Sequence, residues 1–364
     1  MSSIVTFLGK GGTGRTTVAI SLAQGLAQTG RKVLLLAQNS LVSYRVALNV
    51  ELSSEPQDIA PNLAVASLSS TVMLEQNWEV VKQLEQQYLR SPIIKNVFGQ
   101  ELGVLPGMDE ALALNQLREY YQSSKYDVII YDGAGGMSTL RMFAIPEVLD
   151  WYVRRFKNLF LESDIVKALS PFMQPVTAAI LNVSWSFNDF ETAETRKANQ
   201  VLENGKQALK EKKVIAYLVA TEDEYATAEA KYLWGSAQQI GLNVGGLLLN
   251  KSVGSGDLAA DFKPLKVTSL PQISKGDLQP LSDALSHLFD ADNPDPISFD
   301  FDNNKILVFL PGFTKKQVKL TQNGSEITVE AGEQRRNIQL PTQWSDRSVT
   351  GAKFTDNYLE LTIN

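Results

Sequence analysis

Apolar residues in the first ~290 positions form short unbroken runs, and these alternate with longer amphipathic stretches. Short apolar runs are typical of strands buried in a parallel sheet, and the amphipathic stretches are typical of the helices that cover such a sheet. The order of the runs therefore predicts an α/β fold with a doubly wound, mainly parallel sheet. The runs that we interpret as strands are Ile4 to Leu8, Val33 to Leu36, Leu63 to Ala66, Tyr126 to Asp132, Val214 to Ala220 and Val244 to Asn250.

The segments between these strands divide into helices and loops. We expect residues 51–70, which hold Pro56, Pro61 and a cluster of serines, to form a loop that contains the short strand Leu63 to Ala66. Residues 252–264 are also loop-like, and one interpretation of residues 38–42 is an ordinary strand-to-helix loop. A strongly helical stretch of about residues 140–213 predicts a helical insertion in this domain. The other predicted helices are Thr17 to Gly30, Met73 to Leu89, Glu110 to Ser123, Tyr225 to Gly241 and Gln279 to Phe289.

The pattern changes after a polar, proline-containing segment at residues 290–296, which has the composition of a linker. Beyond it, short alternating runs predict strands, and Gln322-Asn323-Gly324 predicts a hairpin turn. We therefore expect two domains, residues 1–292 and residues 296–364, the second a compact all-β sandwich. Its predicted strands are Ile306 to Phe309, Val318 to Leu320, Ile327 to Glu330 and Leu359 to Ile363.

A glycine-rich segment, Gly9 to Thr17, lies between the first predicted strand and the first predicted helix. In this context backbone N–H groups and the positive end of the helix can bind phosphates. Arg15 stands where the phosphate-loop pattern G-x-x-x-x-G-K-[ST] has lysine, and it keeps a positive charge. The pattern predicts that Thr16 binds Mg²⁺ and that the loop binds ATP; the alternative is a glycine-rich turn without a ligand. The predicted nucleotide-binding residues of the loop are Gly11, Gly12, Thr13, Gly14, Arg15, Thr16 and Thr17.

The run Tyr126 to Asp132 ends in a carboxylate at the carboxyl end of a buried strand. In a phosphate-loop enzyme such an acid lies beside Mg²⁺ and the phosphates, so Asp132 is a candidate catalytic residue. The next four residues, 133–136, include three glycines and predict a mobile segment that senses the γ-phosphate. Asn250 ends the last predicted strand of the sheet, where it is either a ligand or a turn former.

The loop Lys10-Gly11-Gly12-Thr13-Gly14-Arg15-Thr16-Thr17 resembles the deviant Walker A loop, K-G-G-x-G-K-[ST]-T, of one ATPase family. That family contains the arsenite-pump ATPases, the tail-anchored-protein targeting ATPases and the Min- and Par-type ATPases. The resemblance implies a homodimer in which Lys10 reaches the partner's nucleotide. It also implies that Asn250 recognises the adenine edge. Asn39 stands where the family has the aspartate that positions the attacking water, and an amide cannot accept a proton as a carboxylate does. We therefore expect slow hydrolysis, with Lys10, Asn39 and Asp132 as the candidate catalytic residues.

The tail resembles the α-crystallin domain of small heat-shock proteins. The match is carried by Leu310 to Val318 (LPGFTKKQV), by Leu340-Pro341 and by Ala352 with Asn357 to Leu359. The I-x-I segment through which those proteins assemble is absent, so large cages are not expected. In the tail-anchored-targeting relatives, helices equivalent to residues 140–213 form a groove for a hydrophobic client helix. The alternative is that these helices cover the sheet or make a dimer contact.

Composition narrows the choice of partners. The chain has 34 basic and 40 acidic residues, a net charge of −6, and no basic run that would indicate nucleic-acid binding. It has no cysteine, which excludes disulfides and thiolate zinc sites, and it lacks the thiolates that trivalent arsenic prefers. No stretch approaches the roughly 18 consecutive apolar residues of a transmembrane helix, so we expect no stable membrane insertion and a cytoplasmic location.

Two hypotheses lead from these features. The first is an ATP-controlled, homodimeric chaperone or targeting factor for hydrophobic client segments, such as those of tail-anchored membrane proteins. The second is a nucleotide-binding regulatory or scaffolding protein with little turnover. Metalloid-transport ATPase activity is a third and less favoured hypothesis, because the chain lacks thiols.

Overall fold

The computed structural model describes residues 2–38, 41–70, 72–73, 107–162, 193–252, 254, 258–274, 276–286, 288 and 293–364. Its largest sheet has eight strands in the order β3-β4-β2-β5-β1-β6-β7-β8. β3 pairs antiparallel with β4, and the other neighbouring pairs are parallel. The predicted mainly parallel sheet is thus confirmed. The strands are β1 (Ser3–Leu8), β2 (Val33–Ala37), β3 (Gln57–Ala60), β4 (Leu63–Ser67), β5 (Val128–Asp132), β6 (Val214–Ala220), β7 (Asn243–Asn250) and β8 (Val267–Leu270).

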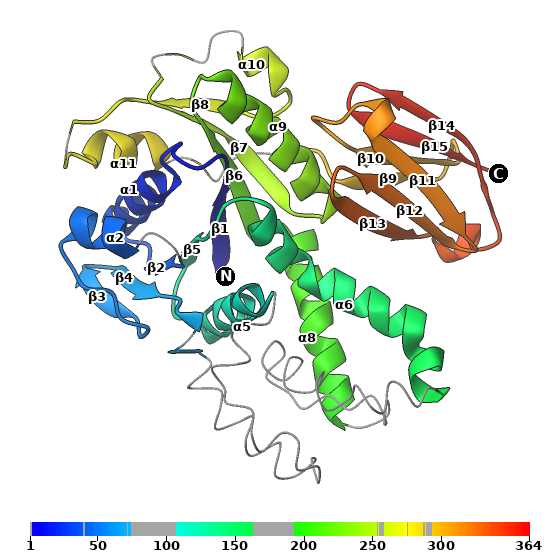
Figure 1. Cartoon of the computed structure of the whole chain (residues 1–364), viewed down its shortest axis with the longest axis horizontal. Coiled ribbons are helices and arrows are strands. Elements are labelled where there is room, and N and C mark those ends of the chain that lie inside the picture. The colour runs from blue at the N-terminus through cyan, green and yellow to red at the C-terminus, as the bar shows by residue number, and fades with distance from the viewer. Residues whose placement is uncertain are drawn as a thin grey trace.

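Helices cover both faces of this sheet, as Figure 1 shows. One face packs against α1 (Arg15–Gln28), α2 (Leu41–Leu48) and α11 (Gln279–Leu285). The other packs against α5 (Met108–Ser123), α6 (Met137–Glu162), α8 (Ala193–Lys210) and α9 (Glu224–Gln239). Successive side chains of a strand point to opposite faces, so β1 sends Val5 and Phe7 into the first core and Ile4 and Leu8 into the second. The doubly wound arrangement is therefore confirmed.

Several elements differ from the sequence prediction. Residues 41–48 form α2, which had no predicted counterpart and which includes the last two residues of the loop considered at 38–42. Its apolar pattern is ambiguous, because only Tyr44 of the helix is buried. β3 and β8 have only four residues each and partly polar sequences, which gave no apolar run. Within the predicted loop 252–264 the chain forms one helical turn, α10 (Leu258–Asp261). Most of the predicted helix Met73 to Leu89 and the middle of the helical insertion, residues 163–192, lie outside the described residues.

The C-terminal region is an antiparallel β-sandwich, as predicted. Its two sheets have the orders β14-β15-β10-β9 and β11-β12-β13, and they enclose a core that includes Ile306, Val308, Ile327 and Val329. The predicted hairpin turn is confirmed, because Asn323 pairs with Glu326 across Gly324. The strands are β9 (Ile297–Asp300), β10 (Lys305–Phe309), β11 (Val318–Asn323), β12 (Glu326–Ala331), β13 (Gln334–Gln339), β14 (Val349–Thr355) and β15 (Tyr358–Ile363), with single turns η2 (Lys315–Gln317) and η3 (Thr342–Trp344).

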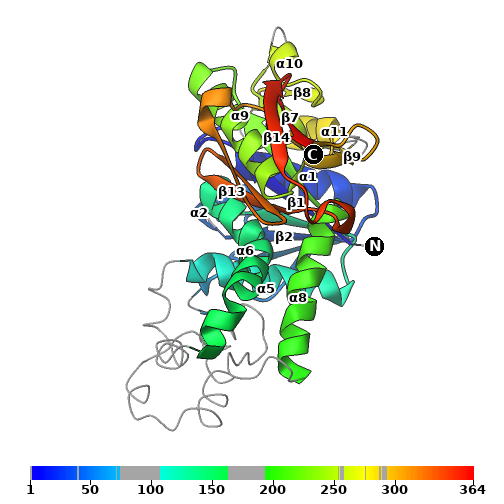
Figure 2. The same ribbon diagram turned by 90° about the vertical axis from the view of Figure 1, so that its right-hand side faces the viewer.

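This sandwich packs directly on α9 and α6 (Figure 1 and Figure 2). Phe309 is buried in the same core as the larger sheet, with its ring centroid 5.7 Å from that of Trp234 on α9. A Cβ atom on Gly235 would lie 2.1 Å from the carbonyl oxygen of Pro311, so the two backbones touch where glycine allows it. The Leu310-to-Phe313 segment that carries the α-crystallin resemblance is thus part of the docking contact.

Polar contacts along α6 extend this interface. Arg141 forms an ion pair with Glu333 at 3.1 Å. Trp151 donates a hydrogen bond to Glu326 at 3.1 Å, and the guanidinium of Arg335 stacks over its ring. At the C-terminal end of the predicted linker, Asp295 forms an ion pair with Lys212 at 3.1 Å. The two parts of the chain are therefore joined by packing as well as by the linker.

Candidate functional site

The glycine-rich segment forms a loop between β1 and α1, in the middle of the sheet. Gly12 and Gly14 have φ angles of 88° and 93°, in the left-handed region that favours glycine. Gly14 is the N-cap of α1, and no side chain caps this helix end. The first N–H groups of α1 are therefore available to an anion, which is the property that the sequence predicted for this loop.

Two buried side chains hold the loop in this conformation. The hydroxyl of Thr13 donates to the carbonyl oxygen of Lys10 at 2.9 Å. Asn250, at the end of β7, donates from its amide nitrogen to the carbonyl oxygen of Thr13 at 2.8 Å. Its amide oxygen accepts from the N–H of Lys251 at 3.0 Å. Asn250 is thus an anchor of the loop, and its predicted recognition of adenine stays a prediction.

Arg15 connects α1 to the segment that follows β5. Its guanidinium donates a hydrogen bond to the carbonyl oxygen of Ala134, and its side chain occupies the space where a Cβ on Gly135 would lie. Burial lowers the pKa of Arg15, and the negative charge of Asp132 opposes that shift. Glycine at 135 therefore makes room for the residue that replaces the usual lysine.

Asp132 lies at the end of β5 and is 3 % exposed. Its carboxylate accepts a hydrogen bond from the phenol of Tyr44 at 2.8 Å and another from the side chain of Thr16. Burial raises the pKa of Asp132, and the hydrogen bonds from Thr16 and Tyr44 and the charge of Arg15 oppose this shift. The sequence did not identify Tyr44, because nothing in the 41–48 pattern indicates which side chain turns toward the site.

The segment after β5 contacts both the loop and α6. The N–H of Gly9 donates to the carbonyl oxygen of Gly135 at 2.9 Å. The N–H of Gly135 in turn donates to the hydroxyl of Thr139 in the first turn of α6, also at 2.9 Å. A displacement of this segment would consequently alter the contact with the first turn of α6, the helix that contacts the C-terminal sandwich.

The remaining candidate residues are placed as follows. Lys10, Gly11 and Gly12 are exposed, on the open side of the loop. The pKa of Asp223 is lowered by hydrogen bonds from Thr221 and from the N–H of Ala226, and also by the charge of Lys10. Asn39 lies outside the described residues, so the structure does not test its role.

These residues fit a nucleotide with Mg²⁺. Exposed N–H groups at a helix N-terminus suit phosphate oxygens, and the adjacent oxygens of Thr16 and Asp132 are of the kind that Mg²⁺ prefers. Lys10 and Arg15 supply positive charge on two sides of the loop. The structure thus places Thr16, Arg15 and Asp132 next to one another and Asn250 against Thr13.

Comparisons with known proteins place the chain in a family. The profile of the family described as anion-transporting ATPase matches residues 2–263, and that of the "HSP20-like domain found in ArsA" matches residues 302–363. The chain is similar to a putative arsenical pump-driving ATPase of Chlorobaculum tepidum, with 26 % identity over 98 % of this chain and 95 % of that protein.

Two further relatives widen the comparison. A putative arsenical pump-driving ATPase 1 of Aquifex aeolicus is 22 % identical over 93 % of this chain and 94 % of its own length. An ATPase ASNA1 homolog of Babesia bovis is 33 % identical over 39 % of this chain and 38 % of its own length. Because the family profile spans more than half of the 364 residues, the chain belongs to the anion-transporting ATPase family and carries an HSP20-like region at its C-terminal end.

Proposed function

We propose that this protein binds ATP with Mg²⁺, hydrolyses it slowly as a homodimer, and uses it to control the handling of hydrophobic client segments. The observation that carries the nucleotide part is the placement of Thr16 and Arg15 beside the carboxylate of Asp132, with Arg15 hydrogen-bonded to Ala134 and the loop anchored by Asn250. Mg²⁺ would supply charge stabilisation at the phosphates. Thr16 and Asp132 would hold the ion, and the loop N–H groups and Arg15 would bind the phosphates.

Slow turnover is proposed from Asn39. An amide can hydrogen-bond a water molecule but cannot take its proton, so the residue does not replace the family's aspartate as a base. We expect Mg²⁺-dependent phosphate release from the wild type, accelerated about tenfold or more in Asn39→Asp. Asn49→Asp, the same change at the exposed residue that follows α2, should leave the rate unchanged. Wild-type release that is fast, or a rate that Asn39→Asp does not alter, would contradict this role. A protein that binds ATP without any release would favour the regulatory hypothesis.

The dimer is proposed from two exposed features. Lys10 is exposed on the loop, where it would reach a partner's nucleotide. On α2 the side chains of Leu41, Val42 and Val46 are 43 %, 63 % and 76 % exposed, while Tyr44 of the same helix enters the site. An apolar helix face beside a nucleotide site is a surface that a second copy would cover.

Val46→Asp should therefore weaken dimerisation at least about tenfold, because the dimer would bury an unpaired charge. Light scattering of the full chain with ATP and Mg²⁺ measures this. The matched control is Tyr225→Asp, at a similarly exposed apolar residue of α9 (77 %). A wild-type monomer under these conditions, or a Val46→Asp protein that dimerises normally, would contradict the proposed interface.

Client handling is proposed from the family relationship, the HSP20-like region and the surface of α6. Val148 and Tyr152 are one helical turn apart and are 45 % and 48 % exposed. Tyr152→Asp should reduce at least about twofold the protection of a client carrying an apolar helix of ~20 residues. Light scattering of the aggregating client measures the effect, again with Tyr225→Asp as control. Equal protection by wild type and Tyr152→Asp would exclude this face of α6 as a client surface.

A further inference from the structure

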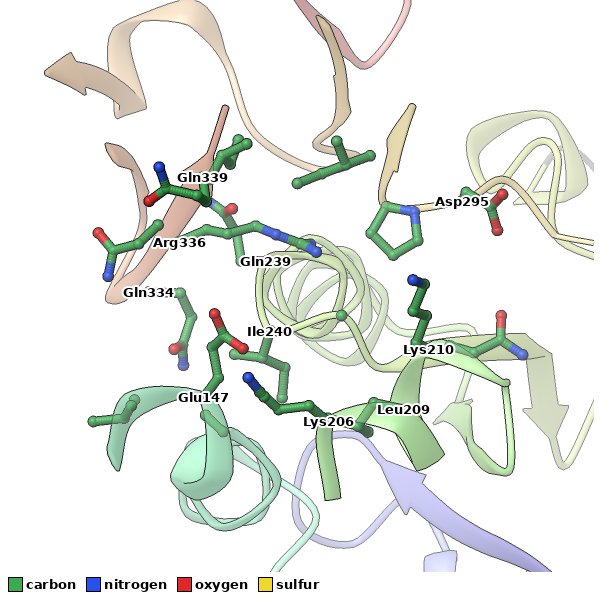
Figure 3. A pocket seen from close by; sticks show the side chains of 18 of the residues that line it. Glu147, Lys206, Leu209, Lys210, Gln239, Ile240, Asp295, Gln334, Arg336 and Gln339 are labelled. Atoms are coloured by element: carbon green, nitrogen blue, oxygen red, sulfur yellow. The ribbon is translucent and has the colours of Figure 1, made fainter. Parts of the chain in front are cut away.

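A cavity of about 570 Å³ lies where α6, α8 and α9 meet the C-terminal sandwich. None of its lining residues belongs to the phosphate-binding loop or to the segment after β5. Figure 3 shows Glu147 and Lys206 lying side by side at one end and Arg336 extending across the cavity from β13. A concave space of this size matches sites that hold small molecules.

Arg336 is the central charge of the cavity. Its guanidinium donates to the carbonyl oxygen of Gln238 at 2.6 Å, at the C-terminal end of α9. Burial lowers the pKa of Arg336 to about 10, an effect that the charge of Glu147 opposes. A guanidinium has five N–H donors, so one bond to a carbonyl leaves most of its capacity for a planar anion.

Gln239 provides a second and independent indication of a ligand. It borders the cavity and is 1 % exposed, and neither its amide nitrogen nor its amide oxygen has a hydrogen-bond partner among the residues that the structure describes. The amide oxygen of the neighbouring Gln238 is also buried and has no partner in the described part of the chain. Buried amides are normally hydrogen-bonded, and an unpaired one requires an explanation such as a bound molecule.

The charges around the cavity favour an anion. Five lining residues are basic (Lys206, Lys210, Lys212, Arg335 and Arg336) and three are acidic (Glu147, Glu203 and Asp295). Lys206 pairs with Glu203 and Asp150, and Lys212 pairs with Asp295. Lys210 is exposed and forms no ion pair within the described part of the chain. Arg335 donates to Asn337 and Thr328 and lies over the ring of Trp151. Arg336 and Lys210 are therefore the lining cations with the most capacity for a ligand.

We propose that this cavity binds a small organic anion, whose carboxylate or phosphate pairs with Arg336 and Lys210 and whose hydroxyl or amide groups hydrogen-bond to Gln239. Such a ligand would contact α9 and α8 of the ATPase region and β13 of the sandwich at once. It would thereby stabilise the docking of the two parts. This site is independent of the nucleotide function proposed above.

The test is calorimetric titration of the full chain with four probes. Gluconate carries a carboxylate, glucose 6-phosphate and inorganic phosphate carry a phosphate, and glucose is the neutral control. We expect an anionic sugar to bind below about 1 mM, which is about 4 kcal/mol of binding free energy, and glucose not to bind. Tighter binding of gluconate would identify a carboxylate ligand, and tighter binding of glucose 6-phosphate a phosphorylated one.

Variants locate the binding. Lys210→Gln, at an exposed residue, should weaken it at least about threefold and Arg336→Gln about tenfold or more. Glu147→Gln should strengthen it, because a like charge is removed; loss of folding could not mimic this effect. Lys316→Gln, on the sandwich outside the cavity, is the control. The proposal is overturned if no anion binds at about 10 mM, or if Lys210→Gln and Glu147→Gln have no effect. It is equally overturned if Arg15→Ala abolishes binding, since the anion would then occupy the phosphate-binding loop.

Discussion

Gly14→Ala should destabilise the protein and remove its response to ATP, because position 14 has no room for a side chain. The residue has a φ of 93°, and an added Cβ would lie 2.3 Å from the amide nitrogen of Asn250. The left-handed backbone costs about 1 kcal/mol for a non-glycine residue, and loss of the Asn250 hydrogen bond costs about 1 kcal/mol more. We expect Tm to fall by roughly 4–8 °C, with no further shift on addition of ATP and Mg²⁺.

Gly11→Ala separates loop structure from ligand binding. Within the described residues no atom lies within 4 Å of a Cβ built on Gly11, so the Tm of Gly11→Ala should stay within about 1 °C of wild type. The methyl group would nevertheless project from the open side of the loop, where we place the phosphates. It should therefore weaken ATP binding at least about tenfold. If Gly14→Ala keeps the ATP response, or Gly11→Ala leaves ATP affinity unchanged, the phosphates do not bind at this loop.

Gly235→Ala should destabilise the protein, although the same change in a free helix would stabilise it. In a helix interior, alanine is more stabilising than glycine by about 1 kcal/mol. Here the new Cβ would lie 2.1 Å from the carbonyl oxygen of Pro311 and 2.6 Å from the ring of Phe313. The sandwich must then move off α9, so we expect a net loss of about 2 kcal/mol or more in the free energy of unfolding.

Ala228→Gly on the exposed side of the same helix is the control for helix propensity alone. It should cost about 1 kcal/mol, and denaturant unfolding of both variants gives the comparison. A more stable Gly235→Ala protein would show that the helix behaves as if it were free, and the docking of the sandwich on α9 would then be wrong.

The sequence predicted those parts of the fold whose own residues determine them. The buried parallel strands appear as apolar runs, because both faces of the sheet are covered. α2 was not predicted. Its apolar residues at 41, 42 and 46 are exposed, so the helix lacks the buried apolar stripe by which a helix is recognised in a sequence. β8 has only four residues and is defined by its pairing with β7, which local sequence does not encode.

The same distinction applies to the site and to the two parts of the chain. The glycines of the loop could be predicted, because phosphate binding requires N–H groups in a tight turn. The hydrogen bonds from Tyr44 to Asp132 and from Arg15 to Ala134 could not be predicted, because each joins residues that are far apart in the sequence. The amphipathic pattern of residues 225–241 indicated a buried helix but not that Trp234 would pack against Phe309 of the sandwich.

The most direct test of the central claim is the Tm of the full wild-type chain with ATP and Mg²⁺. A ligand that binds only the folded state stabilises it by RT ln(1 + [L]/Kd), which is about 2.7 kcal/mol at a hundredfold excess over Kd. We predict a rise of several degrees at millimolar ATP with Mg²⁺ and a smaller rise when EDTA removes the metal. No rise with ATP or ADP, with or without Mg²⁺, would contradict the assignment of a nucleotide to this loop.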